Sequence, residues 1–403
     1  MTAHPRANNA GTARLTETAR LTPAESRDRL SETLDGVVDL IQDAAAIAIA
    51  IPSMEAKLLL ARQIEAAAGW GARIAARIGE LDRAPVDLPA RRRQAAARYP
   101  APCDAAAATA RLTARAMETG PALMARAGDH LDRLHPIWDE PTRRILDHLT
   151  HGIADQIADS RQCLTTIVPG PDETPAHAGG MPGRDRRFTV VDNARLVLDA
   201  PDHDGRMAEL MHYTLMATEI PTIEVCCGML RDFPDMPWDF VSDMGRQLWD
   251  EARHAEACIE RLHEAGGRIG DLPVDHRNWR LSADHPLPVR LAVHQRIGEW
   301  LGVDAAIAWI DRLAGQGDVR TTTLLAFIAE DEIGHVAIGN RWLRRLCGDG
   351  DAAVWAVHRD ADAIRQAAAG NINGHMPLPL NEARCLRGGF NHTEIAALRR
   401  QRS

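Results

Sequence analysis

Apolar residues recur with the period of an α-helix through most of the chain, and segments rich in proline and glycine separate the helical stretches. In the first half, Thr22 and Pro23 are typical of a helix start, and Pro52 must interrupt the stretch that follows. The helices expected there cover about 21–81, 103–132 and 139–163. In the second half they cover about 205–231, 239–266, 286–314 and 318–347, with a further helix near 351–369. The pattern predicts an all-α protein in which Pro221 kinks the first long helix of the second half.

The best candidate for a domain boundary is the segment 169–187, which contains eight glycines and prolines. We expect it to open a linker between two helical regions. The expected parts are a flexible N-terminal arm (1–22), an N-terminal helical domain without metal ligands (23–168), a linker (169–204), a four-helix bundle (205–350), and a C-terminal helix and tail that pack on the bundle (351–403).

Composition and charge narrow the class of protein. Of the 403 residues, 45% are hydrophobic and 26% charged, so sizeable cores are expected and wholesale disorder is excluded. The net charge of -9 argues against a protein that binds nucleic acid by neutralising phosphates. Seven cysteines without a Cys-x-x-Cys pair indicate reduced thiols. Because the sequence shows no apolar segment of signal-peptide or membrane-spanning length, we expect a cytoplasmic protein without a membrane partner.

Two segments of the second half, 250–254 and 331–335, share the pattern Asp-Glu-x-x-His. About one Glu-x-x-His is expected by chance in such a chain. Four occur, but the preceding Asp makes a chance pair of such segments rare. A Glu and a His three residues apart lie on nearly the same face of a helix, so both can bind one metal ion. The two segments are therefore candidate metal sites.

Each motif has a glutamate upstream, on the preceding predicted helix. Glu219 lies 32 residues before Glu251, and Glu299 lies 33 residues before Glu332. The midpoint of each span coincides with a turn-like segment, so folding each pair of helices at its turn places the glutamate opposite the Glu-x-x-His. Ferritin-like di-iron and di-manganese bundles use this arrangement, in which two helices each give one Glu and the other two each give Glu-x-x-His.

The order Glu, Glu-x-x-His, Glu, Glu-x-x-His resembles the ferritin-like di-iron carboxylate proteins, which include rubrerythrin and bacterial multicomponent monooxygenases. A bacterial ferritin-like family of unknown function is more closely similar, in the segments MATEIPTIEV, DEARHAE, GEWLGVDA, AEDEIGHVAIGN and PLPLNEARCLRGGF. This resemblance covers residues of about 205–392, roughly half of the chain. It departs from the family pattern at Trp300 and Leu301, where relatives carry Ala and Arg, so the substrate role of that arginine does not carry over.

The resemblance implies two metal ions and six residues that would be both metal ligands and catalytic residues: Glu219, Glu251, His254, Glu299, Glu332 and His335. Glu251 and Glu332 would bridge the two ions. Ligands of this kind suit two iron ions, with manganese or a mixed manganese–iron pair as alternatives, and O2 as co-substrate. Asp250 and Asp331 would each accept a hydrogen bond from a ligand histidine on the partner helix and fix its tautomer.

Other residues near the motifs leave alternatives open. Glu224 and Asp304 lie five residues after the single glutamates, about 140° around the helix, and are expected to be structural partners rather than ligands. His212 could line a substrate pocket or belong to the core, and Tyr213 is a further candidate for the pocket. Arg384 could close over the site or cap a helix.

Three functions fit these features. The first is an O2-activating non-haem di-iron oxidase or oxygenase that acts on a small organic metabolite. The second is a ferroxidase or iron-handling protein, although a chain with extra helices fits an iron-storage shell less well. The third is a tRNA-modifying hydroxylase, which is known among relatives but is opposed by the net charge. We favour the first, with a small-molecule substrate, and leave open an electron donor and a second copy of the chain as partners.

The N-terminal half could be a degenerate copy of the same bundle. Pro52 can be aligned with Pro237, because each opens a long helix, and aligning Asp139 with Asp318 makes apolar positions of the two segments coincide. In this alignment the four Glu-x-x-His ligands become Ala66, Gly69, Ile153 and Gln156. The alternative is that any two amphipathic helices align this well, because the 3.6-residue period fixes where apolar residues recur.

Overall fold

The computed structural model describes residues 21–102, 104–167, 180–348, 350–369 and 380–402. Within these ranges the protein consists of helices and connecting loops, with one isolated β-bridge between Val190 and Val274, so the all-α prediction is confirmed. None of the helices in this part of the chain is long and apolar enough to cross a membrane. The predicted flexible arm lies almost wholly outside the described residues.

The first half forms a bundle of four long helices, the third of which contains the π-helical segment η1. Their bounds are α1 (Pro23–Ala50), α2 (Met54–Asp82), α4 (Ala105–Ala114) continued by η1 (Arg115–Thr119) and α5 (Gly120–Arg133), and α6 (Glu140–Thr166), with α3 (Leu88–Arg98) packed on α1. Thr22 caps α1 in a reciprocal pair with Glu25, and Pro23 follows, as predicted. Pro52 separates α1 from α2, and the side chain of Ser53 caps α2.

The second half forms another four-helix bundle, and its helices agree with the predicted ranges to within a few residues. The bounds are α7 (His203–Thr214) continued by η2 (Leu215–Glu219) and α8 (Ile220–Asp232), α9 (Trp238–Glu264), α11 (Leu287–Leu291) continued by η3 (Ala292–Glu299) and α12 (Trp300–Leu313), and α13 (Val319–Cys347). Helices α10 (Arg277–Ser282), α14 (Asp351–Ala369), α15 (Glu382–Arg387) and α16 (His392–Arg402) lie against this bundle, mainly beside η3 and α13.

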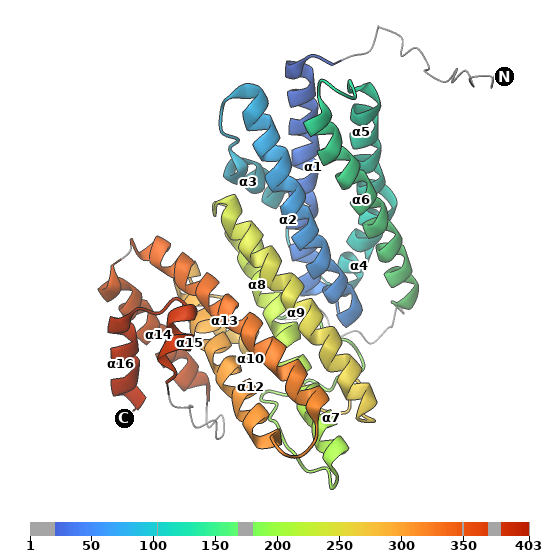
Figure 1. Cartoon of the computed structure of the whole chain (residues 1–403). Helices are drawn as coiled ribbons and strands as arrows, with labels where there is room; N and C mark the ends of the chain where they lie inside the picture. Colours follow the sequence, from blue (N-terminus) through green and yellow to red (C-terminus); the bar gives the residue numbers. More distant parts are fainter. Residues whose placement is uncertain (1–20, 103, 168–179, 349, 370–379, 403) are drawn as a thin grey trace, which may run out of the picture.

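The two bundles lie against each other (Figure 1), and the buried side chains at their junction belong to one hydrophobic core. Helix α2 packs against α9, and α1 packs against α8. A buried ionic cluster also crosses this junction: Lys57 Nζ lies 3.0 Å from Glu224 Oε1, and Arg184 donates to the same carboxylate. Lys57 Nζ also donates to the carbonyl of Ala48, 2.7 Å away, at the end of α1. Glu224 is therefore a structural partner, and the middle of the predicted linker (169–204), where Arg184 lies, is built into the junction.

Candidate metal centre

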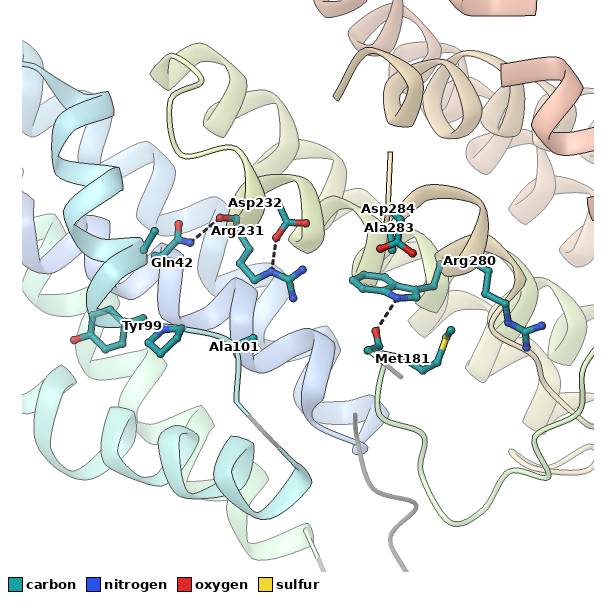
Figure 2. Close-up of a pocket in the computed structure, with 13 residues that line it drawn as sticks. Gln42, Tyr99, Ala101, Met181, Arg231, Asp232, Arg280, Ala283 and Asp284 are labelled. Atoms are coloured by element: carbon teal, nitrogen blue, oxygen red, sulfur yellow. Dashed lines mark hydrogen bonds and ion pairs between the residues drawn. The ribbon is translucent and has the colours of Figure 1, made fainter. Parts of the chain in front are cut away.

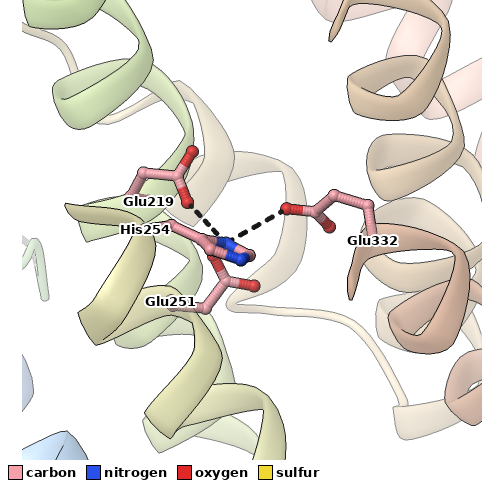
Figure 3. A group of neighbouring side chains, drawn as sticks. All are labelled: Glu219, Glu251, His254 and Glu332. Atoms are coloured by element: carbon pink, nitrogen blue, oxygen red, sulfur yellow. Dashed lines mark ion pairs between the residues drawn. The ribbon is translucent and has the colours of Figure 1, made fainter. Parts of the chain in front are cut away.

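The structure brings the six predicted ligands together in the interior of the second bundle. They form two groups of four buried residues, in each of which the potential ligand atoms lie within 4.8 Å of one another. The first group is Glu219, Glu251, His254 and Glu332, and the second is Glu251, Glu299, Glu332 and His335. Figure 3 shows the carboxylates of the first group around the ring of His254. Glu251 and Glu332 belong to both groups, so this arrangement could hold two neighbouring metal ions.

Glu219 owes its position to a π-helical segment that ends on it. Pro221 has no N–H and cannot donate to the carbonyl of Ala217, one turn earlier. Asn278 Nδ2 donates to that carbonyl instead, at 2.9 Å. The predicted kink is thus a change of helix type over Leu215–Glu219, a feature common at functional sites. Glu219 Oε1 accepts a hydrogen bond from Thr218 Oγ1, at 2.8 Å.

Glu299 is likewise the last residue of a π-helical segment, η3. Gln247 Nε2 donates to Glu299 Oε1 at 2.9 Å. Burial raises the pKa of Glu299 well above its usual value, and the nearby carboxylates of Glu332 and Glu251 raise it further. A carboxyl group in this environment favours its neutral form unless a cation is close by.

The two histidines present one ring nitrogen to the carboxylates and the other to an aspartate. Nδ1 of His254 lies 3.4 Å from Glu219 Oε2, and Nδ1 of His335 lies 3.1 Å from Glu251 Oε1. His254 Nε2 is 3.1 Å from Asp331 Oδ2, and His335 Nε2 is 3.4 Å from Asp250 Oδ2. The expected cross-helix contacts between each Asp and a His are present. They fix Nδ1 as the nitrogen available to a metal.

An arginine of the first motif joins the two aspartates. Arg253 Nη2 donates to Asp250 and, at 2.9 Å, to Asp331 Oδ2. Burial opposes ionisation of Asp250, but hydrogen bonds from His335, Arg246 and Arg253 hold its pKa far below the usual range. Hydrogen bonds from His254 and Arg253 lower the pKa of Asp331, against burial. Both aspartates are therefore ionised and can hold the histidine N–H groups.

The donor set fits metal ions in a further respect. Glu219 Oε2 and His254 Nδ1 lie 3.4 Å apart as an ion pair, but neither of these buried atoms makes a hydrogen bond to a described residue. Unpartnered buried polar atoms are costly, and a coordinated cation would satisfy both. Two divalent cations would also balance the four buried carboxylates of the site. Without them, burial lowers the pKa values of His254 and His335 less than the surrounding carboxylates raise them, so both pKa values lie well above the usual range.

A cavity of about 660 Å³ borders the ligands, and Glu219, Glu299 and Glu332 form part of its wall. Tyr213 lines it, as expected. His294 lines it too and was not predicted: its Nε2 lies 3.4 Å from Glu299 Oε1, and burial lowers its pKa to about 4. His294 lies five positions before Glu299. In an α-helix this spacing would place the two side chains on different faces, whereas in the π-helical segment they share one face.

His212 and Arg384 do not line this cavity. His212 is buried in the core, where its Nε2 accepts a hydrogen bond from the backbone N–H of Gly270, at 3.0 Å. The core alternative for His212 is thus the observed one, because its ring holds the loop that follows α9. Arg384 lies on α15, beside α13, and the side chain of Asn381 rather than Arg384 caps that helix.

A second hollow lies at the junction of the two bundles and contains none of the predicted site residues. It has a volume of about 550 Å³ and is lined by Gln42, Tyr99 and Arg231, among others (Figure 2). Gln42 Nε2 donates to the carbonyl of Arg231 across it, at 3.1 Å. The ligand cluster therefore borders the larger of these two hollows.

The fold and the site define an all-helical protein with buried acidic and histidine clusters that could bind metal. The chain belongs to the family described as "Protein of unknown function (DUF455)", which matches residues 140–396. A curated relative, an uncharacterized protein of Haemophilus influenzae, is 32% identical over 109 residues. That alignment covers 27% of this chain and 38% of the relative. No solved structure matches the chain significantly.

Proposed function

We propose that this protein is an O2-activating oxidase or oxygenase with a di-metal centre, most simply two iron ions, and that it acts on a small organic molecule. The observation that carries the proposal is the pair of four-residue ligand groups that share Glu251 and Glu332 and border a cavity. Four carboxylates and two imidazoles suit iron or manganese rather than a structural zinc ion. Ferritin-like di-iron carboxylate proteins, which the sequence resembles, use the same set.

Each part of the site has a task in this function. The six ligand side chains would hold the two ions, which would supply the activation of O2 when bound. Asp250 and Asp331 hold the histidines in the tautomer that leaves Nδ1 free for a metal. The cavity admits a molecule of small-metabolite or drug size to the face formed by Glu219, Glu299 and Glu332.

The lining of the cavity favours an oxidase or oxygenase over the two alternative functions. A ferroxidase or iron-handling protein needs a path for ions, whereas this cavity is walled largely by apolar side chains such as Leu210, Leu325 and Ile328. A tRNA-modifying hydroxylase remains an alternative, but the net charge of -9 disfavours binding of a polyanion. Both alternatives use the same ligands and differ in what enters the cavity.

Metal analysis followed by oxygen uptake tests the proposal. The metal content of the full chain should approach two ions per chain, and anaerobic loading with ferrous iron should give a protein that consumes O2 on exposure. Glu332→Ala should bind less metal and consume O2 no faster than ferrous iron in buffer. A chain that binds no iron or manganese, or a variant that keeps full O2 uptake, would contradict the proposal.

A further inference from the structure

The cavity beside the ligand cluster has an unusual distribution of positive charge. Three arginine side chains line it. Two of them are neutralised: Arg277 Nη2 lies 2.7 Å from Asp275 Oδ2, and Arg296 Nη2 lies 2.8 Å from Glu394 Oε1. The third, Arg365 of α14, has no carboxylate oxygen within 4.0 Å anywhere in the described part of the chain. Arg365 is thus a cation of the cavity wall that forms no ion pair with any described residue.

The position of Arg365 relates it to the ligand cluster. Its Nη1 donates to the carbonyl of Val293 at 3.0 Å, which anchors the guanidinium against η3. A Cβ atom added at Gly298 would lie only 3.3 Å from the same Nη1, so the guanidinium lies beside the residue that precedes Glu299. This is the only protein hydrogen bond of the guanidinium among the described residues, and an arginine has five donors.

The nearby charges leave Arg365 positive. Burial lowers its pKa to about 10, and Glu299 acts in the opposite direction, so the group is charged at neutral pH. Asp362, one turn earlier on α14, also lines the cavity, but its carboxylate accepts a hydrogen bond from Gln366 Nε2 at 2.8 Å. Burial raises the pKa of Asp362. Asp362 and Arg365 attract each other across the wall, but no oxygen of Asp362 lies within 4.0 Å of the guanidinium, so the two side chains do not form an ion pair.

Much of the remaining wall is apolar. It includes Leu210, Ile297, Leu301, Trp309 and Ile328. With its volume of about 660 Å³, the cavity falls in the range of sites that enclose a whole small molecule. A ligand that fits this wall has a hydrocarbon body and one negatively charged end.

We propose that the cavity binds an organic acid with an apolar body, whose carboxylate is held by the guanidinium of Arg365 beside Glu299. The planar fork of one guanidinium matches one carboxylate with two parallel hydrogen bonds. A phosphate dianion would need further cations, and the other two arginines of the wall are already paired. That such an acid is the substrate rests on the proposed oxidase or oxygenase function. That the cavity binds such an acid does not depend on that function.

Binding of three matched probes tests the assignment: octanoate, octanamide and octyl phosphate. Titration calorimetry on the full chain, both metal-free and loaded with manganese, gives each dissociation constant. We expect octanoate to bind at least about 10-fold more tightly than octanamide, because a hydrogen-bonded ion pair of this kind exceeds a neutral hydrogen bond by about that factor. Arg365→Met should bring the two affinities to within about 2-fold of each other. Arg365→Lys, which keeps the charge but loses the fork, should give an intermediate ratio.

Arg359→Met is the matched control, because Arg359 lies exposed on the same helix and does not line the cavity. It should keep the preference of the unaltered protein for octanoate. The proposal would be overturned if octanoate and octanamide bound equally well or not at all, or if the preference for octanoate survived Arg365→Met. Tighter binding of octyl phosphate than of octanoate would also overturn it. Circular dichroism establishes that each variant is folded. A positive result for octanoate in a protein that does not consume O2 would leave this assignment standing and remove the proposed function alone.

Discussion

The two bundles of this protein have the same order of helices and opposite kinds of interior. Glu251 and His254 are the fourteenth and seventeenth residues of α9, and the same places in α2 carry Ala67 and Trp70. Glu332 and His335 hold those places in α13, and Ile153 and Gln156 hold them in α6. The second bundle thus places carboxylates and imidazoles in its core where the first carries mainly apolar side chains.

Contacts between the helices support this correspondence. In the second bundle, the ring of His254 reaches Asp331, the thirteenth residue of α13. In the first bundle, the ring of Trp70 packs against Gly152, the thirteenth residue of α6: a Cβ atom there would lie 2.3 Å from Trp70 Cζ2. An apolar ring over a glycine therefore occupies the place of the histidine–aspartate pair.

The third helices match as well. Helices α5 and α12 both have 14 residues, and each directly follows a π-helical segment. Arg115, four residues before the end of η1, donates to Gln63 Oε1 at 3.1 Å. Gln295 holds the same place in η3, four residues before its end, and its Nε2 lies 3.5 Å from Gln247 Oε1. The comparison shows that similar helical frames accept a mainly apolar core with a few polar side chains or a cluster of charged candidate ligands.

Counting from the helix starts gives a register that differs by one residue from our alignment of the first helix pair. We expected Ala66 and Gly69 at the positions of Glu251 and His254, but Gly69 is exposed. The shift of one residue has a local cause: Ser53, the residue after Pro52, caps α2, whereas Pro237 itself is the N-cap residue of α9. Two prolines at similar places in a sequence need not occupy the same position at a helix start.

The strongest test of the comparison changes the seventeenth residue in each bundle. His254→Ala removes a ligand nitrogen and should lower iron-dependent O2 uptake by more than about 100-fold, since even loss of a residue that only orients a ligand costs 10–100-fold. Trp70→Phe, at the matching place in the first bundle, should leave O2 uptake within about 2-fold. Oxygen-electrode measurements on both iron-loaded variants check this. Equal losses in the two variants would show that the first bundle contributes directly to the site.

The second test introduces a carboxylate into the mainly apolar core of the first bundle. Ala67→Glu buries an unpaired charge where Glu251 has its counterpart, and should lower the free energy of unfolding by about 3–5 kcal/mol. Ala67→Gln is the control for size. Because burial raises the pKa of the new carboxyl group, it binds a proton more readily in the folded protein, and the penalty should shrink as the pH falls. Urea unfolding at two pH values measures this, and a pH-independent penalty would assign the effect to size alone.

The third test asks whether the bundles unfold together. Lys57 is the only lysine of the chain, and its ammonium is fully buried between Glu224 and the carbonyl of Ala48. Lys57→Met leaves the carbonyl of Ala48 without this donor and Glu224 with Arg184 as its remaining cation, and it should lower the free energy of unfolding by about 3 kcal/mol. Calorimetry should show one unfolding transition with a lower midpoint temperature, because the hydrophobic core is continuous across the junction. Two separated transitions would show that the bundles are independent folding units.

Much of the fold followed from local sequence features. Pro52, the capping pair of Thr22 and Glu25, and the turns between hairpin partners fix helix ends within a few residues. The six candidate ligands could be named because Glu-x-x-His spacing is local and each turn lies midway between a glutamate and its motif. These features act over one helix turn or one hairpin, which a single sequence displays.

The rest of the site depends on contacts that the sequence does not display. A π-helical segment adds one residue to a turn, and hydrophobic periodicity does not reveal this. Gln247 and His294 therefore resembled ordinary core residues. Arg365 lies 66 residues after Glu299, on a helix whose placement against η3 depends on the packing of the tail. Long-range packing of this kind decides the walls of the cavity and hence its ligand.

The finest test of the comparison adds one methyl group. In Gly152→Ala the new Cβ must displace the ring of Trp70, which should cost about 1–3 kcal/mol through overpacking. Gly128→Ala is the matched control, because a Cβ atom at this helical glycine meets nothing within 4 Å, and it should stabilise the protein by about 0.5–1 kcal/mol. In a Trp70→Phe background the smaller ring leaves room for the new methyl group, so Gly152→Ala should lower the free energy of unfolding by markedly less. Thermal unfolding of the single and double variants measures this interaction between positions 70 and 152. Independent effects of the two changes would mean that Trp70 does not pack on Gly152, the contact on which its match with the His254–Asp331 pair rests.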